Sequence, residues 1–272
     1  QLYGEVRLRA DPRDWGQWIG RSDREMAPEV TTPSVSTLRA VSYRLASTPT
    51  KQLPQAVSAI TTSLVTCKQL LASSHDAKAK HSDAAVAVHR FRTQLSTLLQ
   101  DRTVEGRWAA VVLVKCTIEL GVYEVLQKCA PWVRGLLGIL GKPDPPTTRK
   151  LCIITLMRIF IMTNDYPSLV REITTPSLPT LLTSCLNVFL AGSTSPSVQQ
   201  TLSQRALLPT VLDCFARLLP YHPTIFRSYQ SQLQQLLAQV IAPTPSSGVQ
   251  PCHSFPRPTR KAAQRLLVQI HC

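Results

Sequence analysis

Apolar segments of helical length, separated by proline and glycine, are the feature that most limits how this chain can fold. In the segment 84–99, apolar side chains at Val88, Phe91, Leu95 and Leu98 recur at the spacing of one helical face. The alternation of apolar and polar residues that marks a strand is almost absent. Proline near the start of a segment and glycine just after its end are typical of helices. The pattern therefore predicts an all-α protein.

The same proline and glycine residues also place the helices along the chain. Gly121 is a natural C-terminal stop for one helix, and Asp144 supplies a side-chain acceptor for the free amides that open another. Pro209 renews the helix that begins after Ser195-Pro196. The predicted helices span residues 36–46, 51–72, 84–99, 108–120, 122–140, 147–163, 175–191, 196–219, 224–241 and 260–270.

The helices recur in pairs, which start near Lys51, Val104, Pro145 and Pro196, at spacings of 53, 41 and 51 residues. HEAT and armadillo units repeat at roughly 40 to 47 residues. One helix pair cannot bury its apolar face alone, whereas stacked pairs form a continuous core with a long surface. We therefore expect an α-solenoid of HEAT/armadillo-like helical repeats, with a globular helical bundle as the alternative.

The same pattern divides the chain into four parts. Residues 34–242 form the expected repeat domain, residues 243–258 a Pro/Ser linker, and residues 259–272 a further basic helix of the repeat domain. Residues 1–33 are an irregular N-terminal extension with mixed charges. Its Trp15 and Trp18 fit either packing against the first helices or a groove on a partner.

Charge is the feature of the composition that bears on partners. The 272 residues include 30 Lys and Arg against 16 Asp and Glu, a formal net charge of +14. Residues 34–100 and 192–272 each carry +6, whereas residues 1–33 carry −1. A basic surface attracts polyanions such as nucleic acids. RNA contact is therefore expected, and solubility is the simpler alternative reason for the excess charge.

The cysteines and the apolar runs predict a compartment. The eight cysteines are widely spaced and most lie in apolar segments, unlike the dense frameworks of secreted disulfide proteins. No signal-peptide pattern opens the chain. The longest apolar run, Leu151–Met162, is interrupted by Thr155 and Arg158 and is shorter than the roughly 18 residues of a membrane span. We expect a soluble intracellular protein with reduced thiols and no membrane contact.

No residue pattern predicts catalysis, a metal site or a cofactor. Gly135, Gly138 and Gly141 precede Lys142, but proline follows that lysine where a phosphate-binding loop needs Ser or Thr. These glycines instead predict close helix packing. Cys-x-x-Cys and His pairs four residues apart do not occur, and the carboxylates are scattered. We expect a protein that is not an enzyme and that holds neither metal nor cofactor.

Leucine-rich strings have two interpretations. Leu-x-x-Leu-Leu begins at Leu95, Leu178 and Leu233, and on an exposed helix this pattern can bind a hydrophobic groove. In a solenoid the same leucines form the buried stripe of a helix. We expect the core position for these leucines and for Trp132.

Basic residues are the candidate contacts for RNA or a protein partner. Arg158 interrupts an apolar run, so its charge must reach solvent, line a groove, or pair with a carboxylate such as Glu172. The segment 260–265 is the densest basic patch and lacks aromatic residues, which suits phosphate contact rather than base recognition; an acidic protein fits it too. The candidates are Arg149, Lys150, Arg158, Arg260, Lys261 and Arg265.

Three long strings in the middle of the chain resemble a known family. They are EGRWAAVVLVK (105–115), APWVRGLLGILGKPDPPTTRKLCIITLMRIF (130–160) and YPSLVREITTPSLPTLLTSCLN (166–187). With them the chain resembles the fungal Rix-type pre-rRNA-processing proteins and their animal relatives, the proline-, glutamate- and leucine-rich proteins. The resemblance is close over about residues 100–190 and looser over 34–99 and 195–272.

The resemblance implies a non-enzymatic helical-repeat scaffold, dimeric, in a nuclear complex with a WD-repeat protein and a second helical-repeat subunit. In that family the complex acts on precursors of the large ribosomal subunit in the nucleolus and nucleoplasm. It takes part in removing the second internal transcribed spacer, alongside an AAA-type remodelling ATPase. A freestanding RNA-binding α-solenoid is the alternative function. A karyopherin-like transport receptor fits less well, since such receptors are usually longer and more acidic.

Overall fold

The computed structural model describes residues 35–73, 83–190, 198–241 and 255–271, and only the backbone of residues 73 and 198–204. Every regular element in these ranges is a helix, which confirms the all-α prediction. The N-terminal extension with Trp15 and Trp18 lies outside the described residues, as do residues 243–254 of the predicted linker. His75, His81, Cys252, His253 and Cys272 also lie outside the described residues.

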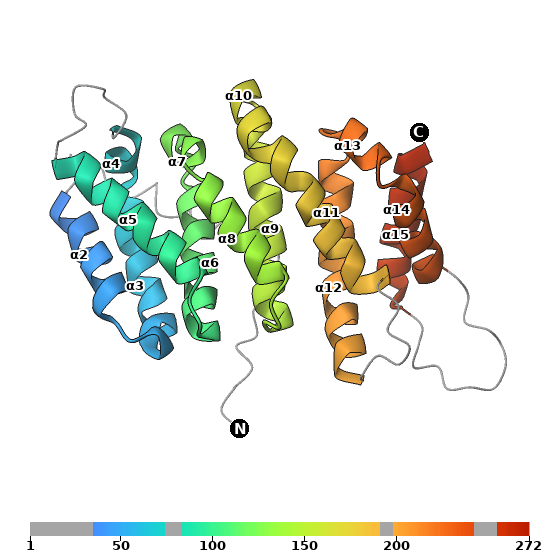
Figure 1. Cartoon of the computed structure of the whole chain (residues 1–272), viewed down its shortest axis with the longest axis horizontal. Coiled ribbons are helices and arrows are strands. Elements are labelled where there is room, and N and C mark those ends of the chain that lie inside the picture. Colours follow the sequence, from blue (N-terminus) through green and yellow to red (C-terminus); the bar gives the residue numbers. More distant parts are fainter. Residues whose placement is uncertain (1–34, 74–82, 191–197, 242–254, 272) are drawn as a thin grey trace, which may run out of the picture.

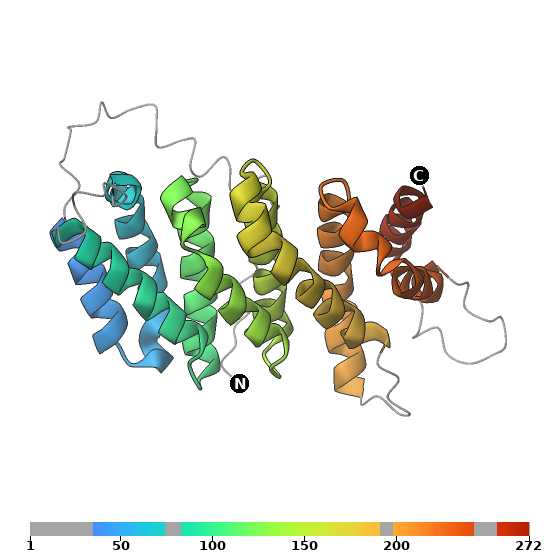
Figure 2. The ribbon, with the colours of Figure 1, turned by 45° about the horizontal axis from the view of Figure 1, so that its top comes forward.

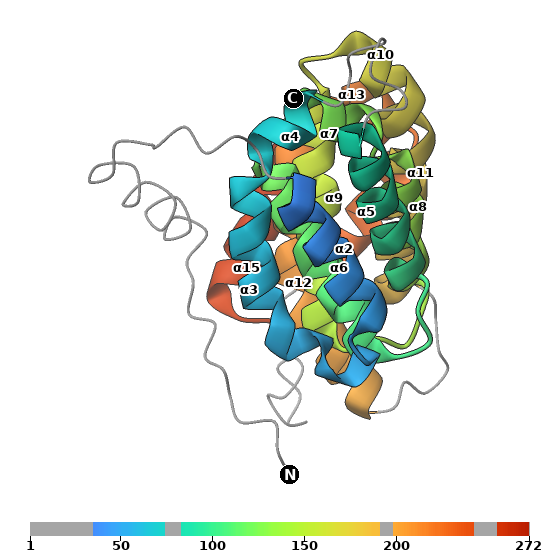
Figure 3. The same ribbon diagram turned by 90° about the vertical axis from the view of Figure 1, so that its left-hand side faces the viewer.

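Ten longer helices form two layers, in which each helix packs against the next member of its own layer. Figure 3 shows α5, α8 and α11 on one side of the molecule and α3, α12 and α15 on the other. Layer A consists of α2 (Val35–Ser47), α5 (Asp83–Leu99), α8 (Ala130–Leu140), α11 (Thr175–Leu190) and α14 (Gln230–Ile241). Layer B consists of α3 (Leu53–Thr66), α6 (Val104–Glu119), α9 (Pro146–Thr163), α12 (Val198–Leu218) and α15 (Arg257–His271).

Short helices carry the chain from layer B back to layer A. They lie along one edge of the molecule, the upper edge in Figure 1. In order they are α4 (Lys68–Ser73), α7 (Tyr123–Gln127), α10 (Pro167–Leu169) with the π-helical turn η4 (Val170–Thr174), and α13 (Pro223–Arg227). A 3₁₀ turn, η2 (Thr50–Gln52), joins α2 to α3.

The result is an α-solenoid of HEAT/armadillo-like repeats, each made of a layer A helix and a layer B helix, with a short helix before every pair except the first in the described residues. The units follow one another in sequence order along the long axis, and the tilted view of Figure 2 shows the same order. The four predicted pair starts fall within two residues of the starts of α3, α6, α9 and α12. The repeat spacing predicted from the sequence is therefore the spacing between successive helices of layer B.

Three predicted helices are each divided into two or three shorter elements, so their continuity was predicted wrongly. Residues 51–72 divide into η2, α3 and α4, residues 122–140 into α7 and α8, and residues 224–241 into α13 and α14. In each case the chain must change direction between the two layers. In the second case Pro131, which cannot donate a helical hydrogen bond, lies in the first turn of α8 and so marks the break.

The core is one continuous cluster between the layers. Its largest fully buried side chains include Trp132, Phe91, Phe160 and Phe215, so the core prediction for Trp132 is confirmed. The Nε1–H of Trp132 donates to the carbonyl oxygen of Arg92 at 3.3 Å, which joins α8 to α5. The leucines of the three Leu-x-x-Leu-Leu strings are also buried, as predicted.

Two glycines behave as their positions predict. Gly121 follows α6 with a φ of +69°, a left-handed conformation that glycine adopts without strain. Gly135 lies on α8 where a Cβ atom would come within 2.9 Å of the Cβ of Leu99 on α5. The close helix packing predicted from the glycine run is therefore confirmed at Gly135.

The continuous helical stretch Pro167–Leu190 is long and apolar enough to cross a membrane when judged by length and composition alone. Here its α11 part packs against α8, α12 and α14. Leu178, Leu181 and Leu182 are fully buried in those contacts. Packing within the stack therefore buries part of this apolar stretch.

Candidate functional site

The six predicted contact residues lie on two helices of layer B. Arg149, Lys150 and Arg158 belong to α9, whereas the other three belong to α15. Helix α12 packs against both α9 and α15 and lies between them (Figure 1). The structure therefore presents two cationic clusters rather than one combined site.

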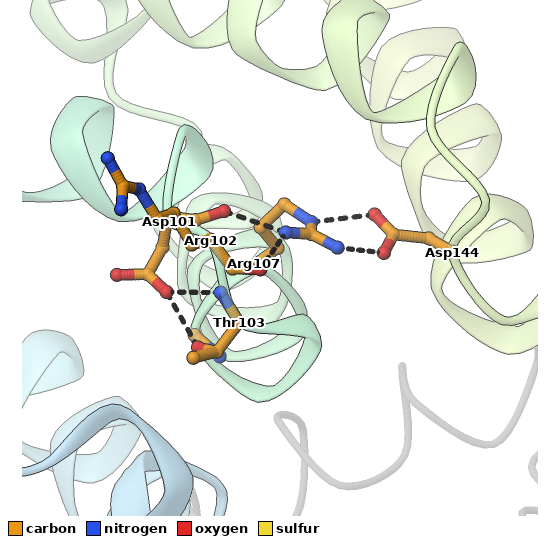
Figure 4. Close-up of polar contacts among 6 residues, drawn as sticks. Asp101, Arg102, Thr103, Arg107 and Asp144 are labelled. Carbon is orange, nitrogen blue, oxygen red and sulfur yellow. Dashed lines mark hydrogen bonds and ion pairs between the residues drawn. The ribbon is translucent and has the colours of Figure 1, made fainter.

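A buried ion pair holds the turn that leads into α9. The Nε–H of Arg107 on α6 donates to Oδ2 of Asp144 at 2.8 Å, and its Nη2 donates to Oδ1 of the same carboxylate (Figure 4). Nη1 donates to the carbonyl oxygens of Asp101 and Arg102 at 2.7 and 2.9 Å. The hydrogen bond to Asp144 is the main cause that raises the pKa of Arg107, so this buried guanidinium stays charged.

The prediction that Asp144 caps α9 is wrong. Pro145 occupies the position before the helix, and no side chain accepts from the free amides there. The carboxylate of Asp144 is instead taken up by Arg107, 37 residues earlier. Sequence reasoning missed Arg107, because α6 also contains Glu105, Lys115 and Glu119 and the charge of Arg107 alone does not distinguish it. The pair joins two of the strings that carry the family resemblance.

The turn before α6 is fixed from its other side by Thr103. Its Oγ1 donates to Oδ1 of Asp101 at 2.6 Å (Figure 4). The same Oγ1 accepts from the amide of Gly106 at 3.2 Å. A Cβ atom at Gly106 would lie 2.9 Å from that Oγ1, so the contact requires glycine. Together with the Arg107 bonds, this capping sets where α6 and α9 begin relative to each other.

Arg149 is engaged within the fold. Its Nη2 donates at 3.2 Å to the carbonyl oxygen of Leu140, at the end of α8, while its Nε is buried without a hydrogen-bond partner in the described residues. The side chain lines a small interior cavity together with Ser184 and Cys185 of α11. Arg149 thus points between the layers and fastens the α8–α9 turn.

Lys150 and Arg158 lie on the opposite side of α9, which faces outward. Arg158 is exposed and Lys150 half-buried, and the half-buried apolar Leu151 and Ile154 lie on the same face. Among the described residues Arg158 has no ion pair, so its charge reaches solvent instead of Glu172. This face combines apolar area with two cations.

Helix α15 carries a row of cations on its exposed face. Arg257, Lys261 and Arg265 are exposed at successive intervals of four residues, about 6 Å apart along the helix axis. Thr259, Ala263 and Leu266 are buried on the other side. Arg260 lies at the margin, half-buried, with its Nε lacking a hydrogen-bond partner among the described residues. The helix contains no carboxylate, and none of the three cations has an ion pair within the described residues.

Burial disfavours the thiolate form of the six cysteines in the described residues. Five of the six are buried, and burial raises the pKa of Cys116 to about 11 and the pKa values of Cys129 and Cys185 to about 12. Burial raises the pKa values of Cys152 and Cys214 as well. Within the described ranges, no three His, Cys, Asp or Glu side chains form a group that could hold a metal ion.

The chain is similar to proteins of one known family. The family model RIX1, described as rRNA processing and ribosome biogenesis, matches residues 37–248. The proline-, glutamic acid- and leucine-rich protein 1 of Xenopus laevis is 38% identical over 63 residues, 23% of this chain and 6% of that protein. Its Mus musculus counterpart is 30% identical over 87 residues, 32% of this chain and 8% of that protein. The matched segments thus span less than a tenth of these relatives.

The family match covers most of the repeat stack and includes both partners of the buried Arg107–Asp144 pair. It runs from α2 to beyond α14 and leaves α15 outside the matched residues. The chain belongs to the RIX1 family of proteins of rRNA processing and ribosome biogenesis.

Proposed function

We propose that the chain is a non-enzymatic scaffold subunit of a nuclear complex that matures the large ribosomal subunit. In this role it takes part in removing the second internal transcribed spacer from the precursor rRNA, in the nucleolus and nucleoplasm. Its partners are a WD-repeat protein, a second helical-repeat subunit, an AAA-type remodelling ATPase and a second copy of itself. Membership of the RIX1 family supports the coarse role, and the resemblance of the central strings supports the partners.

The single observation that carries the RNA contact is the row of cations on α15. Three exposed cations on one face, with no carboxylate on the helix, suit a phosphate backbone. Lys150 and Arg158 on α9 form a second cationic surface in the same layer. Arg149 contributes indirectly, because it holds the turn from which α9 starts.

The test is charge reversal on α15 by Lys261→Glu together with Arg265→Glu. Both side chains are exposed, so the fold is expected to tolerate the change. The tagged variant is purified from cells, and precursor RNA that contains the spacer is quantified alongside the co-purifying proteins. We expect the RNA to fall severalfold while the WD-repeat partner is retained.

The matched control reverses two exposed cations of the first repeat, Arg44→Glu with Lys51→Glu. Equal RNA recovery from both double variants would contradict the role of α15. RNA recovered without the WD-repeat protein or large-subunit proteins would favour a freestanding RNA-binding solenoid. Purification of the unmodified protein with neither RNA nor those proteins would contradict the scaffold.

A further inference from the structure

A groove of about 400 Å³ lies on layer A between α5 and α8. It is lined by Ser96 and Gln100 from the end of α5, and by Arg134, Gly135, Gly138 and Lys142 from α8 and the turn after it. None of the described residues that line it is acidic. The groove belongs to the opposite layer from the cations of α9 and α15.

Gly138 is the residue of this groove that the fold itself does not explain. It lies inside α8, is exposed, and a Cβ atom there would meet nothing within 4 Å. Glycine inside a helix lowers the stability of the helix relative to alanine. At Gly138 no packing contact within the fold compensates for this loss. Gly135, one turn earlier, is different because Leu99 fills its space. The free surface over Gly138 allows a second backbone to come close to α8.

One cation lies on each side of Gly138 in the groove. Arg134 and Gly138 are four residues apart on one face of α8, and Lys142, two residues past the end of that helix, lines the same groove. Neither Arg134 nor Lys142 has an ion pair within the described part of the chain. A ligand that lies along this face therefore passes over bare backbone between two uncompensated positive charges.

We propose that the groove between α5 and α8 is a docking site for an α-helix of a protein partner, with Asp or Glu side chains that meet Arg134 and Lys142. A groove between two packed helices has the shape that receives a third helix, and the missing side chain at Gly138 lets it approach closely. Two cations in a cleft partly lined by apolar atoms provide charge complementarity to an acidic helix. RNA would find only two phosphate contacts here, against three cations on α15.

The experiment places a photo-crosslinking amino acid at Gln100, which is exposed at the rim of the groove. The full chain is expressed in cells, irradiated in its native complex, and the crosslinked peptide is identified by mass spectrometry. We expect a protein segment with helical periodicity and with Asp or Glu on one face. In a Gly138→Leu background the crosslink yield is expected to fall about tenfold, since the new side chain occupies the groove.

Two further variants keep the result interpretable. Arg134→Glu with Lys142→Glu is expected to lower the yield, whereas Lys261→Glu with Arg265→Glu, on α15 in the opposite layer, is not. A crosslinker at exposed Ser58 of α3 gives the background yield. A yield at position 100 no higher than at position 58 would overturn the proposal. So would a crosslink to RNA, a peptide without carboxylates, or a yield unchanged by both groove variants.

This proposal stands apart from the contact of α15 with RNA. The crosslink reports a protein segment on layer A, whereas the charge reversal on α15 reports recovery of RNA from layer B. A failure of either experiment therefore leaves the other interpretable.

Discussion

At the scale of single residues, the Arg107–Asp144 pair carries the largest expected stability cost. Asp144→Ala leaves a buried guanidinium without its counterion, which we expect to destabilise the fold by about 3–5 kcal/mol. Urea denaturation at neutral pH measures the change. Asp213→Ala is the control, since Asp213 pairs with Arg217 on an exposed face and its loss should cost about 0.5 kcal/mol or less. Similar costs for the two variants would mean that Arg107 finds other acceptors.

His222 makes stability depend on pH. It is buried where α12 gives way to α13, its Nε2 has no hydrogen-bond partner among the described residues, and burial lowers its pKa. The unfolded chain therefore binds this proton at a higher pH, near 6.5, than the folded chain does. The free energy of unfolding is expected to fall as the pH drops below about 6.5, and to stop falling below the folded pKa.

The check is thermal denaturation of the native chain and of His222→Gln at pH 7.5 and pH 5.5. We expect the native chain to lose more stability between these two values than the variant, which has no proton to gain at this position. An identical loss in both proteins would place the pH dependence on other groups.

At the scale of elements, the glycines of α8 give a pair of opposite predictions. Gly135→Ala forces a Cβ atom against Leu99 and should destabilise the protein by about 1 kcal/mol or more. Gly138→Ala adds a Cβ atom in open space and should stabilise it by about 0.5–1 kcal/mol. Denaturation midpoints of the two variants test both signs together. A stabilising Gly135→Ala would show that α5 and α8 move apart at little cost.

Elements were predictable where an apolar face and a helix signal coincide. Helix α5, with its apolar stripe, begins and ends within one residue of its predicted bounds. The short helices α7 and α13 were merged with their neighbours, because a change of direction between layers leaves no change in apolar periodicity. Asp144 shows a second reason why prediction from the sequence fails, which is contact between residues far apart in the chain. A carboxylate before a helix start usually caps it, and only the fold brings Arg107 within reach.

At the scale of the whole molecule, the repeat period predicted the stack but not its surfaces. The candidate cations were chosen from their local sequence, and the sequence could not show that α12 lies between α9 and α15. It also could not show that Arg149 turns inward while its neighbour Lys150 turns outward. Side chains one residue apart on a helix differ by about 100° in direction, so packing decides which one is exposed.

Nearest-neighbour packing predicts how the stack responds to truncation. Helices α14 and α15 pack mainly against each other and against α11 and α12. Removal of residues 223–272 should therefore lower hydrogen-exchange protection in α11 and α12 and leave α2 to α6 unchanged. Hydrogen exchange measured by mass spectrometry distinguishes this local loss of protection from the loss throughout the chain that a fully cooperative fold would show. Loss of protection throughout the chain would contradict independent repeats.

The same series of interfaces has a mechanical consequence. In the described residues, the main contacts of each long helix are with helices of its own repeat or of the neighbouring repeats. A force applied between the two ends of the molecule therefore passes through every repeat boundary in turn. A rotation of a few degrees at each boundary adds along the stack, so the ends move far while each interface stays intact. Two molecules bound near α2 and near α15 would therefore change their separation while both stay bound.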